Sequence, residues 1–81
     1  MFSRGDFVVP SNQDTFEPVY RATVWSLDMQ SIVDFLEAHE VATVVKITDG
    51  IAANSLWLQI LTPRGNLGTV HASNLRLLSA N

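Results

Sequence analysis

The segment from Leu56 to Leu78, LWLQILTPRGNLGTVHASNLRLL, constrains the fold of this chain more than any other. It contains an apolar run, a Pro- and Gly-containing turn, a second apolar run, a short polar corner and a last run rich in leucine. Two such runs joined by a short turn with glycine predict a β-hairpin. We therefore expect strands at 56–61, 67–71 and 75–78.

The turn also predicts the hairpin register. Thr62-Pro63-Arg64-Gly65 suits a type I turn, with proline at its second position and glycine in the left-handed position after it. If Thr62 pairs with Asn66, the following residues stand opposite each other: Leu58 and Val70, Ile60 and Gly68, Trp57 and His71, and Gln59 and Thr69. Side chains alternate between the two faces of a strand, so Leu58, Ile60 and Val70 should point into the core together.

The opposite face of this hairpin is the best candidate for a partner-binding site. It would present Trp57, Gln59, Thr69 and His71, and Tyr20 is expected to border it. The competing interpretation is that an outward tryptophan on a small sheet is often half-covered by a loop and extends the core. The loop 10–18, which contains Phe16, is the candidate cover.

The remainder of the chain has further strand signals. β-Branched and aromatic residues favour strands at 5–9, 19–25 and 41–48, and Pro10 and Asp49-Gly50 mark a strand end and a turn. Frequent turns between short strands predict a mainly β fold, a small antiparallel barrel of five to six strands formed by residues 1–81 as one domain. The expected core includes Val8, Val24, Val45, Ile47, Leu58, Ile60, Val70 and Leu77.

The segment 26–40, SLDMQSIVDFLEAHE, is ambiguous. Ser31 followed by Asp34 is typical of a helix N-terminus, and the apolar residues at 32, 33, 35 and 36 would form a helical stripe. A turn followed by a strand is the alternative. We expect one or two helical turns within 31–39.

The order of strand, turn, strand ending in Gly68-x-Val70, polar corner and leucine-rich strand resembles SH3-like barrels, and bacterial-type SH3 domains in particular, over about residues 35–78. The resemblance implies that Trp57 aligns with the tryptophan of the SH3 peptide groove. His71 and Asn74 replace the groove proline and tyrosine, and His39-Glu40 replaces the Gly-Asp of the diverging turn. Binding of PxxP peptides is therefore not expected.

Composition sets further bounds. Hydrophobic residues make up 47% of the 81 residues and charged residues 16%, which fits a packed core and excludes a disordered chain. No cysteine is present, so thiolate chemistry and disulfides are excluded and a cytoplasmic setting is expected. No apolar run approaches the length of a secretion signal or a membrane span.

Charge is distributed unevenly. Three basic and eight acidic residues precede Gly50, a net charge of −5, and Arg64 and Arg76 follow it. Asp34, Glu37 and Glu40 form a candidate acidic patch, so an inhibitor that occupies a basic or nucleic-acid-binding surface is an alternative function. A nucleic-acid- or ribosome-associated barrel is a second alternative, suggested by the Gly5-Asp6 opening but disfavoured by the scattered cations.

No pattern indicates catalysis. The acidic residues around His39 lack a nucleophile or a glycine-rich phosphate loop, and two histidines, His39 and His71, with scattered carboxylates make a poor metal site. We expect no enzyme activity, no catalytic residue, no metal and no cofactor. The sequence favours a protein-interaction module that binds a protein partner rather than nucleic acid or a membrane, and leaves self-association open.

Overall fold

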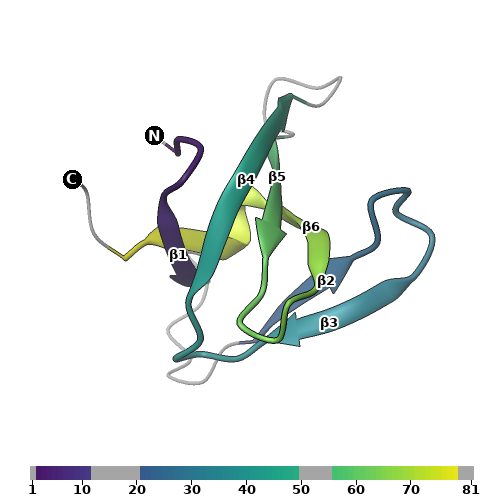
Figure 1. Ribbon diagram of the computed structural model, residues 1–81, viewed down its shortest axis with the longest axis horizontal. Helices are drawn as coiled ribbons and strands as arrows, with labels where there is room; N and C mark the ends of the chain where they lie inside the picture. The colour runs from purple at the N-terminus through teal and green to yellow at the C-terminus, as the bar shows by residue number, and fades with distance from the viewer. Residues whose placement is uncertain (1, 12–20, 50–55, 79–81) are drawn as a thin grey trace.

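A computed structural model describes residues 2–11, 21–49 and 56–78 (Figure 1). These residues form seven β-strands and one short 3-10 turn, with no α-helix among them. The elements in chain order are β1 (Phe7–Pro10), β2 (Ala22–Trp25), β3 (Ile32–Leu36), β4 (Ala42–Asp49), β5 (Leu56–Leu61), β6 (Leu67–His71), the 3-10 turn η1 (Ala72–Asn74) and β7 (Leu75–Leu77). In this part of the chain no helix is long and apolar enough to span a membrane.

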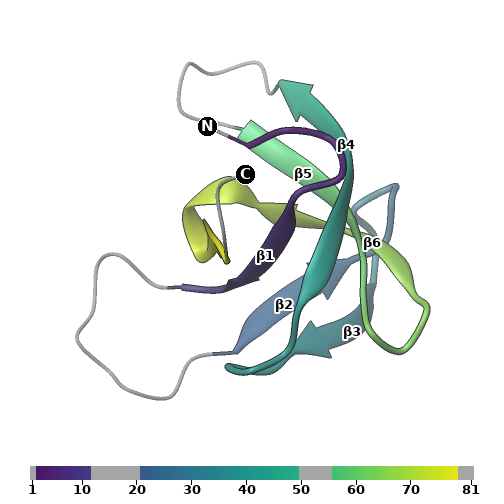
Figure 2. The same cartoon turned by 60° about the vertical axis from the view of Figure 1, so that its left-hand side comes forward.

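The strands form one antiparallel sheet in the order β3-β2-β6-β5-β4-β1-β7. The pairs β2–β3, β4–β5 and β5–β6 are consecutive in sequence, whereas β7 returns to pair with β1. The principal extents of 30 × 27 × 26 Å are nearly equal, so the sheet is strongly curved rather than flat (Figure 2). Among the described residues no pairing joins the end strands β3 and β7, and the sheet is open. The structure thus has seven strands in an open sheet, where a barrel of five to six was expected.

The β5–β6 hairpin has the predicted register. Leu58 stands opposite Val70, Trp57 opposite His71 and Gln59 opposite Thr69. The Thr62 N–H donates to the Asn66 carbonyl over 2.9 Å, and Gly65 has a φ of +87°, the left-handed conformation that favours glycine. Local turn chemistry therefore determines this pairing.

Every strand contributes to the core. The buried cluster contains Val8, Ala22, Val24, Leu36, Ala42, Val44, Leu58, Ile60, Val70 and Leu75. Five of the expected core residues belong to it, and the expected Ile47 and Leu77 pack against it half-buried.

The prediction for Val45 is wrong. Val44 pairs with Ile60 and Lys46 pairs with Gln59, so Val45 is the extra residue of a β-bulge. The bulge shifts the alternation of side chains along β4. Val44 is buried in its place, and Val45 is 37% exposed.

The helix predicted within 31–39 is also wrong. Ile32–Leu36 is the strand β3, which pairs with β2, and a turn follows in which the Glu40 N–H donates to the Glu37 carbonyl over 2.9 Å. Three of the four apolar residues of this strand, Ile32, Val33 and Phe35, are β-branched or aromatic, which suits a strand once a partner strand is present. Asp34, expected in the first turn of that helix, instead lies within β3, and its carboxylate accepts a hydrogen bond from the Phe35 N–H.

Candidate functional site

The outer hairpin face, Trp57, Gln59, Thr69 and His71, lies on the side of β5 and β6 opposite the core. The register places Trp57 beside His71 and Gln59 beside Thr69 on adjacent strands. Trp57, Gln59 and His71 are half-buried, while Thr69 is buried. The predicted set is therefore contiguous, with its aromatic residues partly open to solvent.

Trp57 and His71 contact each other edge to face. Their ring centroids are 5.0 Å apart and the ring planes meet at 87°. His71 is also the N-cap of η1, where its Nδ1 accepts a hydrogen bond from the Ser73 N–H over 3.2 Å and lies 2.7 Å from the Ser73 hydroxyl. This cap holds the imidazole in place, and the imidazole in turn packs against the indole.

Strand β2 extends the outer hairpin face. Trp25 pairs with Thr69, so this half-buried tryptophan lies on the same side of the sheet, next to β6. On the other side, Gln59 pairs with Lys46 of β4. A row of Trp25, Thr69, Gln59 and Lys46 thus crosses four strands. Sequence reasoning missed Trp25, because its position depends on pairing between strands more than 40 residues apart.

Part of the predicted site lies outside the described residues. Tyr20 belongs to the undescribed segment 12–20, which also contains Phe16. The expected contact of Tyr20 with the outer hairpin face therefore remains a prediction, and the competing interpretation, a cover by the loop 10–18, is not tested.

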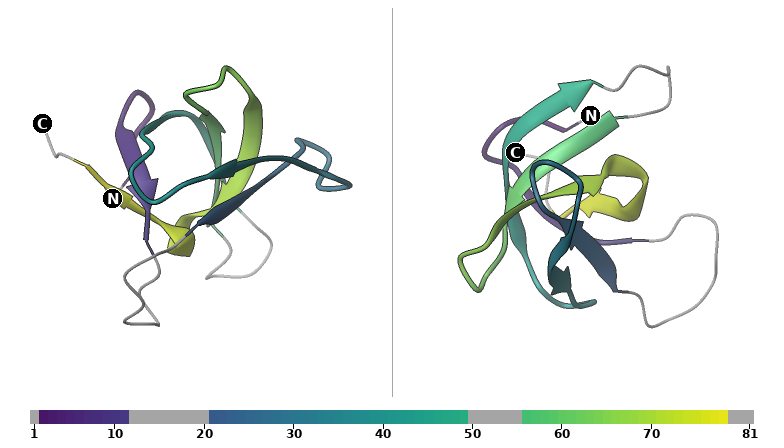
Figure 3. Two further views of the ribbon diagram at one scale, coloured as in Figure 1. Left: turned by 90° about the horizontal axis from the view of Figure 1, so that it is seen from below. Right: turned by 90° about the vertical axis from the view of Figure 1, so that its right-hand side faces the viewer.

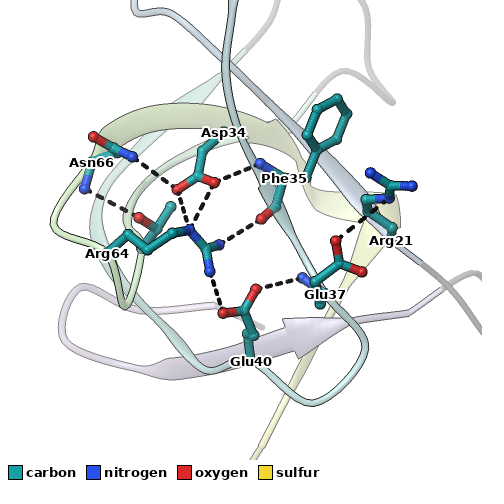
Figure 4. A network of polar contacts seen from close by, with 8 residues as sticks. Arg21, Asp34, Phe35, Glu37, Glu40, Arg64 and Asn66 are labelled. Carbon is teal, nitrogen blue, oxygen red and sulfur yellow. Dashed lines mark hydrogen bonds and ion pairs between the residues drawn. The ribbon is translucent and has the colours of Figure 1, made fainter.

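The acidic residues Asp34 and Glu40 meet at one arginine (Figure 4). The Arg64 side chain, in the β5–β6 turn, donates through Nε to the Asp34 carboxylate, at 2.9 and 3.1 Å to its two oxygens. Its Nη1 donates to Glu40, and its Nη2 donates to the backbone carbonyl of Phe35 over 2.6 Å. A planar guanidinium is suited to such a contact because it presents several donors in fixed directions.

The Asp34 carboxylate is held in its ionised form. Partial burial raises its pKa, but hydrogen bonds from Asn66, Thr62, the Phe35 N–H and Arg64 outweigh burial and lower the pKa to about 2. The hydrogen bond from Arg64 likewise lowers the pKa of Glu40, and the two carboxylates raise the pKa of Arg64. These groups stay charged at neutral pH.

Glu37, the third acidic residue, lies next to another arginine. Its carboxylate is 3.6 Å from Arg21 Nε, and both side chains are exposed. The Arg21 guanidinium also covers the Phe35 ring, with 4.7 Å between its central carbon and the ring centroid. The structure thus brings the predicted acidic residues together on β3 and the turn after it, each beside an arginine. The sequence did not indicate Arg64 as their partner, because the two segments lie about 25–30 residues apart.

Across the described ranges, no group of three or more His, Asp or Glu side chains is arranged to hold a metal ion. The two clusters of interest are therefore the outer hairpin face and the network around Arg64. Comparison of the chain with protein-family models, with curated proteins and with solved structures finds no match.

Proposed function

We propose that this protein is a small, non-catalytic interaction module that binds a protein partner through the outer hairpin face. The observation that carries the proposal is the arrangement of the two tryptophans around a polar strip. Trp57 lies on β5, Trp25 lies on β2, and Thr69 of β6 stands between these strands. Tryptophan is enriched among the residues that dominate binding energy at protein interfaces.

The chemistry of this face suits a protein surface better than a small polar ligand. The indole rings offer large apolar areas, while Gln59 and His71 offer hydrogen-bonding groups beside them. Leu61 and Leu67, which pair at the turn end of the hairpin, are exposed and widen the apolar area on the same side. An aromatic anchor within a mixed polar rim is the usual composition of a protein interface.

The anchor is held in a defined position. Trp57 is supported by His71, and His71 is fixed by its hydrogen bonds to Ser73. A side chain that is already ordered loses less conformational entropy when it binds. This arrangement favours Trp57 as the main anchor of the proposed surface.

We also propose that the fold is a divergent, open relative of the SH3-like barrels. Support comes from the β5–β6 hairpin, the 3-10 turn η1 at the polar corner, and the last strand β7 that pairs with the first strand β1. The groove proline and tyrosine are replaced by His71 and Asn74. We therefore do not propose a PxxP peptide as the partner.

The experiment compares three immobilised proteins: the wild type, Trp57→Ala and Leu78→Ala. Leu78 is the matched control, since it is a large exposed side chain that follows β7, near the far edge of the sheet. Proteins retained from native lysate are identified by mass spectrometry, and binding is then measured with the purified partner. We expect Trp57→Ala to remain folded and to lose about 2 kcal/mol or more of binding free energy, while Leu78→Ala binds normally.

Two results would contradict the proposal. If Trp57→Ala retains every partner of the wild type, Trp57 is not the anchor of the binding surface. If only its thermal midpoint falls while binding by the folded fraction is unchanged, Trp57 belongs to the core.

The acidic inhibitor remains an alternative that the network does not favour. Asp34 and Glu40 are bound by Arg64, and Glu37 is next to Arg21, within the same molecule. A basic partner would have to compete with these arginines.

A further inference from the structure

Strand β3 forms one end of the sheet, and three of its apolar side chains are exposed. Ile32, Val33 and Phe35 are 49%, 41% and 39% exposed. The β2–β3 hairpin reaches away from the rest of the sheet (Figure 3). An apolar edge strand of this kind is a template for pairing with another chain, and natural proteins protect such edges.

The backbone groups of Phe35 are occupied from within the molecule. Its N–H donates to Asp34 Oδ1 over 2.7 Å, and its carbonyl accepts from Arg64 Nη2 over 2.6 Å. In an antiparallel sheet, the N–H and C=O of one residue point to the neighbouring strand on one side, and those of the next residue point to the other side. Among the described residues β2 is the single strand that pairs with β3, so the groups of β3 that point away from β2 have no partner strand. The two groups that an incoming strand would bind at Phe35 are thus already bonded.

The capping side chains are themselves held in place. The guanidinium is fixed between Asp34 and Glu40, and Asn66 donates to Asp34 over 3.0 Å. The Asp34 side chain is only 9% exposed. An incoming strand would therefore have to break several charge-assisted hydrogen bonds, which are stronger than neutral ones.

We propose that Arg64 is an edge cap that prevents β3 from pairing with β3 of a second copy of this chain. A second copy is the relevant occupant because its edge is identical, and two antiparallel β3 strands would meet about a two-fold axis. Exposed apolar side chains of the two copies, Ile32 and Phe35, would then lie beside each other across the new pair. The cap leaves the outer hairpin face of β5 and β6 available for a different partner.

The test measures self-association of Arg64→Gln by light scattering after gel filtration over a range of concentrations. Arg76→Gln is the matched control, because it makes the same charge change on exposed β7 at the opposite edge. We expect the dimer dissociation constant of Arg64→Gln to fall at least about tenfold, while Arg76→Gln matches the wild type. In the double variant Arg64→Gln/Val33→Lys, a charge on the edge should restore the monomer.

Two results would overturn the proposal: a folded Arg64→Gln protein that associates no more than the wild type, or association that Val33→Lys does not reduce. If Arg64→Gln fails to fold, amide exchange of the native protein tests the proposal instead. A protected Phe35 N–H supports the cap, because that amide donates to Asp34, which Arg64 holds in place. Exchange of that amide at the rate of an unstructured chain rejects it.

Discussion

At Asp34, four hydrogen-bond donors outweigh the cost of removing a carboxylate from water. The donors come from Asn66, Thr62, Arg64 and the Phe35 backbone, and together they lower the pKa of Asp34 to about 2. A folded-state pKa below the ordinary value of 3.8 means that the native state prefers the ionised form. The stabilisation is therefore present above pH 4 and is lost as the pH falls toward 2.

This pKa predicts how Asp34→Asn changes the pH dependence of stability. At pH 6 the variant should be less stable than the wild type by about 2 kcal/mol, and the difference should shrink as the pH approaches 2. Urea unfolding at several pH values measures it. Glu37→Gln is the control, since Glu37 forms one exposed ion pair with Arg21 and should change stability little at any pH. If the difference in unfolding free energy between Asp34→Asn and the wild type stays constant from pH 6 to pH 2, the lowered pKa of Asp34 is contradicted.

Among the elements, the hairpin β2–β3 is attached to the rest of the sheet at a close contact with β6. Gly68 stands opposite Ile60 and faces β2, where a Cβ atom would collide with Val24 Cγ1 and lie 2.7 Å from the Trp25 carbonyl oxygen. The absence of a side chain at this position lets β2 approach β6. This contact brings Trp25 next to the outer hairpin face.

We expect Gly68→Ala to separate these strands. The added methyl group should destabilise the fold by about 1–3 kcal/mol, because the backbone oxygen of Trp25 cannot move without shifting β2. Denaturant unfolding measures the loss, and amide exchange should accelerate most in β2 and β3. Leu67→Ala, an exposed change on the same strand, is the control. If the amide exchange rates of β2 and β3 do not change in Gly68→Ala, the close contact between Gly68 and β2 is contradicted.

The same elements show how much of the fold and of the site the sequence predicts. The β5–β6 hairpin was predictable to the residue, because Pro63 and Gly65 determine its turn and alternation determines its faces. The strand β3 was not predictable, because a five-residue segment with four apolar residues fits either a helix or a strand until a partner strand is known. The Val45 bulge has no local signature. For the site, Trp57 and His71 were paired correctly, whereas Trp25 and the Arg64 contacts depend on long-range packing.

At the scale of the whole molecule, the network around Arg64 and the outer hairpin face lie on different elements. The chain carries a net charge of −3, and the network around Arg64, together with the pair Arg21–Glu37, engages the acidic residues of β3 and its following turn. The outer hairpin face instead carries aromatic and neutral polar side chains, with Lys46 at its border. Binding through one surface or the other should therefore respond differently to salt.

Salt dependence separates the two proposed functions. If the partner binds through Trp57, its affinity should change little between 0.1 and 1 M NaCl, although the Debye length falls from about 10 Å to about 3 Å over that range. Binding through the acidic residues should weaken steeply, because long-range attraction to a basic surface is screened. Isothermal titration of the purified partner at both salt concentrations measures the effect. Weak salt dependence combined with loss of binding in Trp57→Ala is the expected result. Elution of the partner by salt, with Trp57→Ala still binding, would favour the acidic inhibitor, since the apolar face would then contribute nothing to recognition.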